Sequence, residues 1–252
     1  IAIIFSAIVT LAGIYSGDRM ILSMSHAVEA DRKKYPHLVN AVEGLAIAAG
    51  IPAPKIYVIE DSAINAFATG RDPKHASVTV TTGAIERLKR DELEGVLAHE
   101  LAHIRNYDIR MMMLVVILVG IIALISDMFL RSVFYGRGKR DSRGKGAAVL
   151  ILIGLVFAVL SPIIAQLIKL AVSRQREYLA DANGALLCRN PTSLANALQK
   201  IKNDKEPLVE AANKATAHLF IENPLRTFGG RINYMFHTHP PIDERIKRLK
   251  NF

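Results

Sequence analysis

The residues best suited to chemistry are His99, Glu100 and His103, which form one H-E-x-x-H motif. On a helix, residues four apart lie on the same face, so both imidazoles can point toward a single ion with Glu100 beside them. A catalytic zinc site uses three protein ligands and leaves its fourth position to water. The motif therefore predicts that His99 and His103 are two zinc ligands and that Glu100 is the base for the bound water.

The flanking sequence helps to separate a real site from a chance match, because so short a motif is weak evidence alone. Asp91 and Glu94 stand three apart just before an apolar-periodic run, a pattern close to a capping box that predicts a helix start. Charged residues surround the motif, which indicates a partly solvated helix and disfavours an intramembrane protease of the site-2 type. These charged residues are Asp91, Glu92, Glu94 and Arg105.

A second helix, predicted in residues 173–182, can supply the ligand that the motif lacks. Glu177 and Asp181 stand four apart and share a helix face. In a His-His-Glu zinc site one carboxylate completes the ligand set, and another can accept the free N–H of a ligating histidine. Glu177 fits the first role and Asp181 the second. The same spacing beside Arg174 and Arg176 is also typical of a solvated helix face, so the prediction needs both motifs together.

The overall composition favours a membrane protein. Of the 252 residues 51% are hydrophobic, and the mean hydropathy of +0.24 is high for a soluble protein. The net charge is +9, but Trp is absent and the basic residues do not alternate with aromatic ones, which favours lipid headgroups and disfavours nucleic acid as the partner. The single cysteine, Cys188, excludes an intramolecular disulfide.

Long apolar runs define the expected membrane segments. Residues 1–16 are expected to be the remnant of an N-terminal transmembrane helix, with a signal peptide as the competing interpretation. Residues 111–130 and 147–170 are predicted to form a transmembrane hairpin, or alternatively a buried hairpin in a soluble core. A basic loop containing several glycines, residues 131–146, joins the two runs.

The other segments, residues 17–110 and 171–252, are predicted to form the two halves of one catalytic domain. Residues 77–81 alternate between polar and apolar side chains, which predicts a strand with Ser77, Thr79 and Thr81 on its polar side. In zinc proteases an extended peptide commonly pairs with an edge strand beside the metal-binding helix. The strand at residues 64–68 or the one at residues 77–81 could be that edge, and an ordinary sheet strand that binds no peptide is equally compatible with the spacing. Strands are predicted at residues 55–60, 64–68 and 77–81, and helices at residues 36–49, 191–202 and 241–250.

Four stretches of the chain together resemble one protein family. They occur in the order and relative placement found in the HtpX family of membrane zinc metalloproteases, and more distantly they are similar to the CaaX prenyl endoproteases. The resemblance covers nearly the whole chain from Gly17 onward. The stretches are HELAH from His99, EYLAD from Glu177, NAFATG from Asn65 and THPP from Thr238.

The resemblance implies an α+β, mainly helical fold: a zincin-like metalloprotease domain with a small sheet, interrupted by the transmembrane helical hairpin. It implies one zinc ion held by His99, His103 and Glu177, with Glu100 as the general base and Asp181 orienting a ligand histidine. For His239, chemistry alone allows either a donor to developing negative charge or a capping or packing role. Further roles implied by the resemblance are substrate-backbone binding for Asn65 and Ala66, and places near the oxyanion for His239 and Arg245.

The predicted function is peptide-bond hydrolysis by a membrane-anchored zinc endopeptidase, acting on unfolded or membrane proteins in quality control. The resemblance implies a location in the inner membrane with the catalytic domain facing the cytoplasm. The basic loop at residues 131–146 opposes transfer across the membrane, so either the hairpin is re-entrant or other spans set the topology. Two alternatives stay open: a peptide-maturation protease of CaaX type, and a catalytically silent scaffold or chaperone-like protein, against which intact Glu100 and Glu177 argue.

Overall fold

The computed structural model describes residues 17–111, 114, 174–204 and 240–252. Within these residues the protein is mainly helical with one small mixed sheet, which confirms the predicted α+β class. The predicted N-terminal remnant lies outside the described residues, and so do the predicted hairpin, apart from residues 111 and 114, and its basic loop. Among the described helices, none combines the length and the apolar character of a membrane span.

The sheet has four strands among the described residues, in the order β1-β2-β4-β3. β2 pairs with β4 in parallel, whereas β1 pairs with β2 and β3 with β4 in antiparallel fashion. β3 is therefore the terminal strand on one side. The strands are β1 (Val28–Glu29), β2 (Lys55–Ile59), β3 (Ala66–Gly70) and β4 (Ala76–Thr81).

β3 begins two residues later than the sequence predicted. The side-chain oxygen of Asn65 accepts the Ala66 N–H at 3.0 Å, and the Asn65 N–H donates to Thr81 Oγ1 at 3.0 Å. The Asn65 carbonyl also accepts the Thr81 N–H at 3.0 Å, so side-chain and backbone bonds together hold Asn65 at the point where the strand begins. Such local bonds to side chains compete with strand pairing, and hydrophobic periodicity does not report them.

The prediction of a polar side for residues 77–81 is wrong in one respect, because all of β4 is buried. Ser77, Thr79 and Thr81 are each at most 4% exposed. The Thr81 hydroxyl donates to the Ala63 carbonyl at 2.6 Å, and a hydroxyl that finds such an acceptor can be buried at little cost. Alternation of polar and apolar residues identified the strand correctly but not its burial.

The predicted helices are present. The α2 helix has Pro36 at its first turn and ends at Gly50, whose φ of 68° is the left-handed conformation that glycine adopts freely. Residues 17–24 are also helical. The other helices are α3 (Thr82–Arg87), α4 (Arg90–Arg105), α7 (Arg174–Cys188), α8 (Pro191–Asn203) and α9 (Ile242–Lys250), with α2 spanning Pro36–Ala49 and a short 3-10 turn at Pro73–His75.

The hydrogen bond that caps the start of the α4 helix is made by other residues than those predicted. The Lys89 N–H donates to Glu92 Oε2 at 2.7 Å, and Lys200 Nζ lies 2.6 Å from the same oxygen, which keeps Glu92 buried. Asp91 and Glu94, which the sequence favoured as the capping pair, are exposed. The predicted capping pair therefore lies two residues later than the observed one, Lys89 and Glu92, and the distant Lys200 also binds the carboxylate of Glu92.

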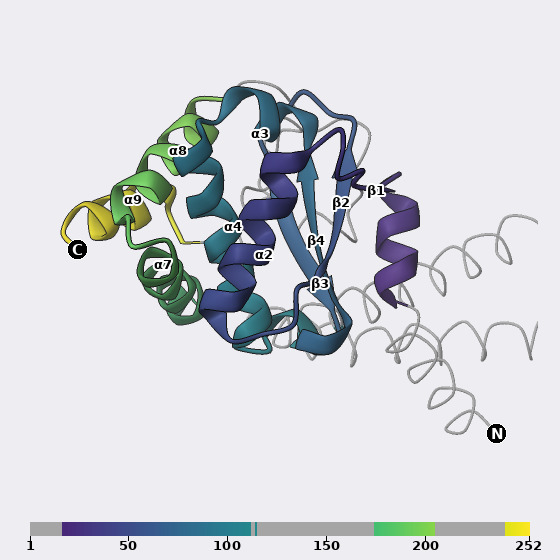
Figure 1. Ribbon diagram of the computed structural model, residues 1–252. Coiled ribbons are helices and arrows are strands. Elements are labelled where there is room, and N and C mark those ends of the chain that lie inside the picture. The colour runs from purple at the N-terminus through teal and green to yellow at the C-terminus, as the bar shows by residue number, and fades with distance from the viewer. Residues whose placement is uncertain (1–16, 112–113, 115–173, 205–239) are drawn as a thin grey trace, which may run out of the picture.

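The α4 helix occupies the centre of the fold (Figure 1). It contacts β3 and β4 of the sheet, and it also contacts α2, α7 and α8. Leu97, Leu101 and Ile104 are each fully buried. A helix covered on several sides is a rigid platform for side chains, and this one carries the H-E-x-x-H motif.

Candidate metal centre

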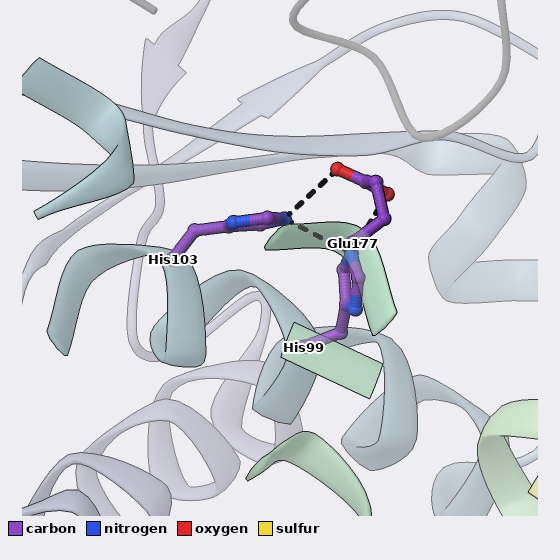
Figure 2. A group of neighbouring side chains, drawn as sticks. All are labelled: His99, His103 and Glu177. Carbon is purple, nitrogen blue, oxygen red and sulfur yellow. Dashed lines mark hydrogen bonds and ion pairs between the residues drawn. The ribbon is translucent and has the colours of Figure 1, made fainter. Parts of the chain in front are cut away.

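His99, His103 and Glu177 meet in the interior of the protein (Figure 2). The two imidazole Nε2 atoms are 3.2 Å apart, and the rings lie edge to face with an interplanar angle of 87°. Glu177 Oε1 lies 3.5 Å from His103 Nε2, and Oε2 lies 3.8 Å from His99 Nε2. Each of the three residues is at most 3% exposed. The two histidines each offer a nitrogen and Glu177 offers an oxygen to one shared point. These ligand atoms all lie within 4.8 Å of one another.

These distances fit a tetrahedral metal ion. Two donors that each lie about 2.0 to 2.1 Å from such an ion are about 3.3 Å apart. The separation of 3.2 Å between the imidazole nitrogens matches this value, and the separations of 3.5 and 3.8 Å to the carboxylate need only a small adjustment. Two neutral nitrogens and a carboxylate are also the donor set of known catalytic zinc sites. The residues present therefore fit a bound divalent metal.

Asp181 and Arg245 lie behind His99. Asp181 Oδ1 is 3.0 Å from His99 Nδ1, and both Asp181 oxygens accept hydrogen bonds from Arg245, at 2.9 Å from Nε and 2.7 Å from Nη2. Burial alone would raise the pKa of Asp181, but the charge of Arg245 and the contact with His99 prevail and lower it to about 2. Asp181 is therefore a carboxylate at neutral pH and an acceptor for the outer nitrogen of His99.

Asp108 occupies the same position relative to His103. Its Oδ2 is 3.0 Å from His103 Nδ1, and its Oδ1 accepts a hydrogen bond from Arg176 Nη1 at 3.0 Å. Burial of the His103 ring opposes its charged form, but Asp108, Glu177 and Glu100 outweigh burial and raise the pKa of His103 to about 9. Each histidine of the pair thus has its own carboxylate, and each carboxylate is bound by an arginine.

Glu100 directly follows His99 in the sequence, and it is buried, with 3% of its surface exposed. Its charge is one of the causes that raise the pKa values of His103 and Arg245, so its carboxylate lies near both groups. Arg245 is 1% exposed, and its Nη1 lies 3.3 Å from Glu177 Oε2. Burial of this guanidinium is outweighed by Asp181 and Glu177, which raise its pKa and keep it charged.

The close approach of α7 to α4 brings Glu177 to the histidines. Glu177, Asp181 and Gly184 follow one another at helical spacing on one face of α7. A Cβ at Gly184 would lie 2.9 Å from the His99 backbone nitrogen and 3.0 Å from its Cα. The absence of a side chain at this position allows the two helices to come close enough for Glu177 and Asp181 to face the pair.

The other predicted site residues have different surroundings. Asn65 and Ala66 lie buried at the start of β3, the terminal strand, which contacts α4. Arg245 is a buried basic residue of α9 that faces Asp181 and Glu177. His239 lies outside the described residues.

Two residues of this centre were not predicted from sequence: Asp108 and Arg176. Asp108 lies beyond the end of α4, where helical spacing no longer relates it to His103. Arg176 was interpreted as part of a solvated face, although its neighbour Glu177 was predicted as a ligand. The rule that a ligating histidine donates its second nitrogen to a carboxylate would have prompted a search for an acid near His103.

A match to a known protein family covers the parts of the chain that form this centre. A family model described as peptidase family M48 matches residues 32–252. The chain belongs to peptidase family M48. Members of this family are metallopeptidases, and the chain is one of them, with His99, His103 and Glu177 as the group that could hold the metal among the described residues.

Relatives within peptidase family M48 are similar over most of their length. The chain is 51% identical over 237 residues to the Protease HtpX homolog of Caldanaerobacter subterraneus subsp. tengcongensis, covering 93% of this chain and 78% of the relative. It is 42% identical over 261 residues to the Protease HtpX homolog of Listeria monocytogenes serotype 4a, covering 100% of this chain and 85% of the relative. The crystal structure of S. mikatae Ste24p aligns with a TM-score of 0.49 at 20% identity, covering 96% of this chain and 58% of that one.

Proposed function

We propose that this M48 metallopeptidase is a zinc-dependent endopeptidase whose ion is held by His99, His103 and Glu177. The observation that carries the proposal is the 3.2 Å separation of the two Nε2 atoms beside a buried carboxylate, the spacing that a tetrahedral zinc ion requires. When bound, zinc lowers the pKa of its water to about 7 and polarises the scissile carbonyl. Asp181 fixes the tautomer of His99 and so keeps the Nε2 lone pair available for the metal.

In this proposal Glu100 moves the proton. Its carboxylate accepts a proton from the attacking water and then delivers it to the amide nitrogen of the departing peptide. Its burial at 3% exposure and its place directly after His99 in the H-E-x-x-H motif support this role. Arg245 holds Asp181 and Glu177 in place; its implied position near the oxyanion stays a prediction, as does that of His239.

We propose that the substrate is an unfolded or membrane polypeptide whose backbone pairs with β3. Two features support this: β3 is the terminal strand among the described residues, and it contacts α4, which carries the histidines. Backbone pairing selects for extended chains and not for particular side chains, which suits a quality-control protease. Asn65 and Ala66, at the start of β3, are the residues proposed to contact the substrate backbone.

The apolar runs at residues 111–130 and 147–170 support membrane anchoring. We propose a multi-pass location in the inner membrane with the catalytic domain on the cytoplasmic side, as the resemblance to the HtpX family implies. Fractionation of expressing cells tests the location directly. The protein is expected in the membrane fraction and to require detergent for extraction. Recovery in the soluble fraction without detergent would contradict membrane anchoring.

A Glu100→Gln variant tests the mechanism. Hydrolysis of an unfolded model protein by the detergent-extracted enzyme is expected to fall at least a hundredfold, because a positioned base contributes about 10² to 10⁴ in rate. Zinc content, measured by elemental analysis, is expected to stay at one ion per chain. Glu94→Gln is the matched control, since Glu94 is an exposed glutamate of the same helix. Equal activity of Glu100→Gln and wild type would contradict the proposed role of Glu100.

A further inference from the structure

We propose that Asp108 is a positioning residue that joins the two halves of the metal centre. One oxygen of its carboxylate lies 3.0 Å from His103 Nδ1, and the other accepts from Arg176 Nη1 at 3.0 Å. Arg176 directly precedes Glu177 on α7. The inference rests on the proposed metal site and extends it: a single carboxylate sets the orientation of one ligand and the position of the helix that carries another.

The chain delivers Asp108 to this position through an unusual turn. The α4 helix ends at Arg105, and the N–H groups of Asn106 and Tyr107 bond back to the Ala102 and Ile104 carbonyls. Tyr107 then adopts a φ of 60°, a left-handed conformation that is unfavourable for a residue with a side chain. After this turn the chain is helical again from Asp108, whose side chain lies beside His103 at 3% exposure. Retention of a disfavoured backbone conformation next to a candidate site is consistent with a requirement for the Asp108 position.

The contact with His103 has a specific chemical consequence. A neutral imidazole carries its proton on either nitrogen, and a carboxylate facing Nδ1 holds the proton there. The Nε2 lone pair is then directed to the point shared with His99 and Glu177. Second carboxylates of this kind also raise the basicity of the ligand, and their removal typically weakens metal binding by about 10- to 100-fold.

The contact with Arg176 has a different consequence, because it acts on α7. Arg176 and Glu177 belong to the first turn of this helix. A charge-assisted bond from Arg176 to the buried Asp108 fixes that turn against the end of α4. Removal of Asp108 therefore affects both the tautomer of His103 and the position of Glu177, whereas removal of Arg176 leaves the carboxylate of Asp108 facing His103.

Substitutions at the two positions separate these effects. Metal affinity is measured by competition of detergent-extracted protein with a chromophoric zinc chelator, and the geometry is followed by the visible spectrum of the cobalt-substituted protein. Asp108→Ala is expected to weaken zinc binding about 10- to 100-fold and to change the cobalt spectrum. Asp108→Asn keeps an oxygen for His103 and is expected to recover part of the affinity. Arg176→Gln is expected to lose less affinity than Asp108→Ala.

The double variant tests whether the two residues act as a unit. Because the bond from Arg176 to Asp108 is already absent in Asp108→Ala, adding Arg176→Gln is expected to cause a smaller loss of affinity there than in the wild-type protein. Matched controls are Asp91→Ala, an exposed acid of α4, and Arg174→Gln, an exposed arginine of the same turn as Arg176; both are expected to bind zinc as wild type does.

The outcomes distinguish this inference from the proposed function. Thermal melting of the metal-free variants identifies any that fail to fold, and Asp108→Asn, which is nearly the same size as the native residue, serves if Asp108→Ala does not. Wild-type protein that binds no metal would contradict the metal site itself. Wild-type affinity and an unchanged cobalt spectrum in both Asp108 variants would overturn the role of Asp108 and leave the metal site intact.

Discussion

The buried charges of the metal centre do not balance among its own side chains. Four carboxylates are each at most 3% exposed, and the guanidinium groups that the described residues bring to them are those of Arg176 and Arg245. With both histidines neutral, these described groups carry two more negative charges than positive ones. Buried charges are unfavourable unless they are paired, and one divalent cation supplies the missing charge. The four carboxylates are Glu100, Asp108, Glu177 and Asp181.

This imbalance predicts that metal binding releases a proton. In the metal-free protein the surrounding carboxylates raise the pKa of His103 from 6.5 to about 9, so the ring is protonated at pH 7. A metal ion binds only the neutral imidazole, so this proton must leave. Zinc affinity is therefore expected to rise about tenfold per pH unit from pH 7 until it levels off near pH 9.

Calorimetric titration with zinc at pH 7.5 measures this release. The apparent binding enthalpy is compared in buffers with different enthalpies of ionisation, and the slope gives the number of protons released. At pH 7.5 His103 is expected to contribute about one proton in addition to the share that comes from the zinc-bound water. The same titration above pH 10 is the comparison, because the ring is then already neutral and the slope is expected to be lower by at least one proton. A slope at pH 7.5 no larger than the zinc-bound water alone can supply would contradict the raised pKa.

Spacing along helices allowed part of the centre to be predicted from the sequence. His99, His103 and Glu177 were all predicted, and the structure brings them together. Asp108 was not predicted because its position depends on the turn at Tyr107, and a non-glycine residue with positive φ has no reliable sequence signal. At this scale helical periodicity predicted the residues that lie on helices, and it did not predict a residue placed by the turn beyond a helix end.

At the scale of elements, the contact between α4 and α7 sets the geometry of the centre. Gly184→Ala is expected to destabilise the protein by about 1–3 kcal/mol, because its Cβ would press on the backbone of His99 at 2.9 and 3.0 Å and neither helix can yield cheaply. The same displacement moves Glu177, so zinc affinity is expected to fall as well. Thermal melting and chelator competition measure the two effects.

Gly44→Ala is the matched control for this prediction. Gly44 is an exposed glycine inside α2, and a Cβ there would meet nothing within 4 Å. Alanine is the better helix former, so this change is expected to stabilise the protein by about 0.5–1 kcal/mol and to leave zinc affinity unchanged. If Gly184→Ala melted and bound zinc as Gly44→Ala does, close packing of α7 on α4 would not control the site.

Most elements were predicted from the sequence, and the errors have a common cause. The α2 helix was predicted at residues 36–49, which are its observed bounds, because its apolar period, Pro36 and Gly50 are all local signals. The starts of β3 and α4 were displaced by two residues. At β3 the Asn65 N–H bonds to a distant residue, Thr81; at α4 the cap is a local bond from the Lys89 N–H to Glu92, whose carboxylate is also bound by the distant Lys200. Hydrophobic periodicity includes none of these contacts.

At the scale of the whole molecule, the described residues that flank the predicted hairpin lie close together. Asp108, just beyond α4, and Arg176, in the first turn of α7, are joined by an ion pair of 3.0 Å. The long intervening stretch, which contains the predicted hairpin, therefore begins and ends on the same side of the domain. A segment with both ends at one surface crosses a membrane an even number of times, either twice or not at all.

Labelling a thiol in the basic loop distinguishes two crossings from none. In a Cys188→Ser background, which removes the native cysteine, a Ser142→Cys variant is treated in intact cells with a membrane-impermeant thiol reagent. The runs at residues 111–130 and 147–170 each have the roughly 20 residues that a span needs, so Ser142→Cys is expected to react from outside. Asn40→Cys, at an exposed position of α2, is expected to react only after lysis. Protection of Ser142→Cys until lysis would mean that the basic charge of the loop prevails and that the hairpin does not span.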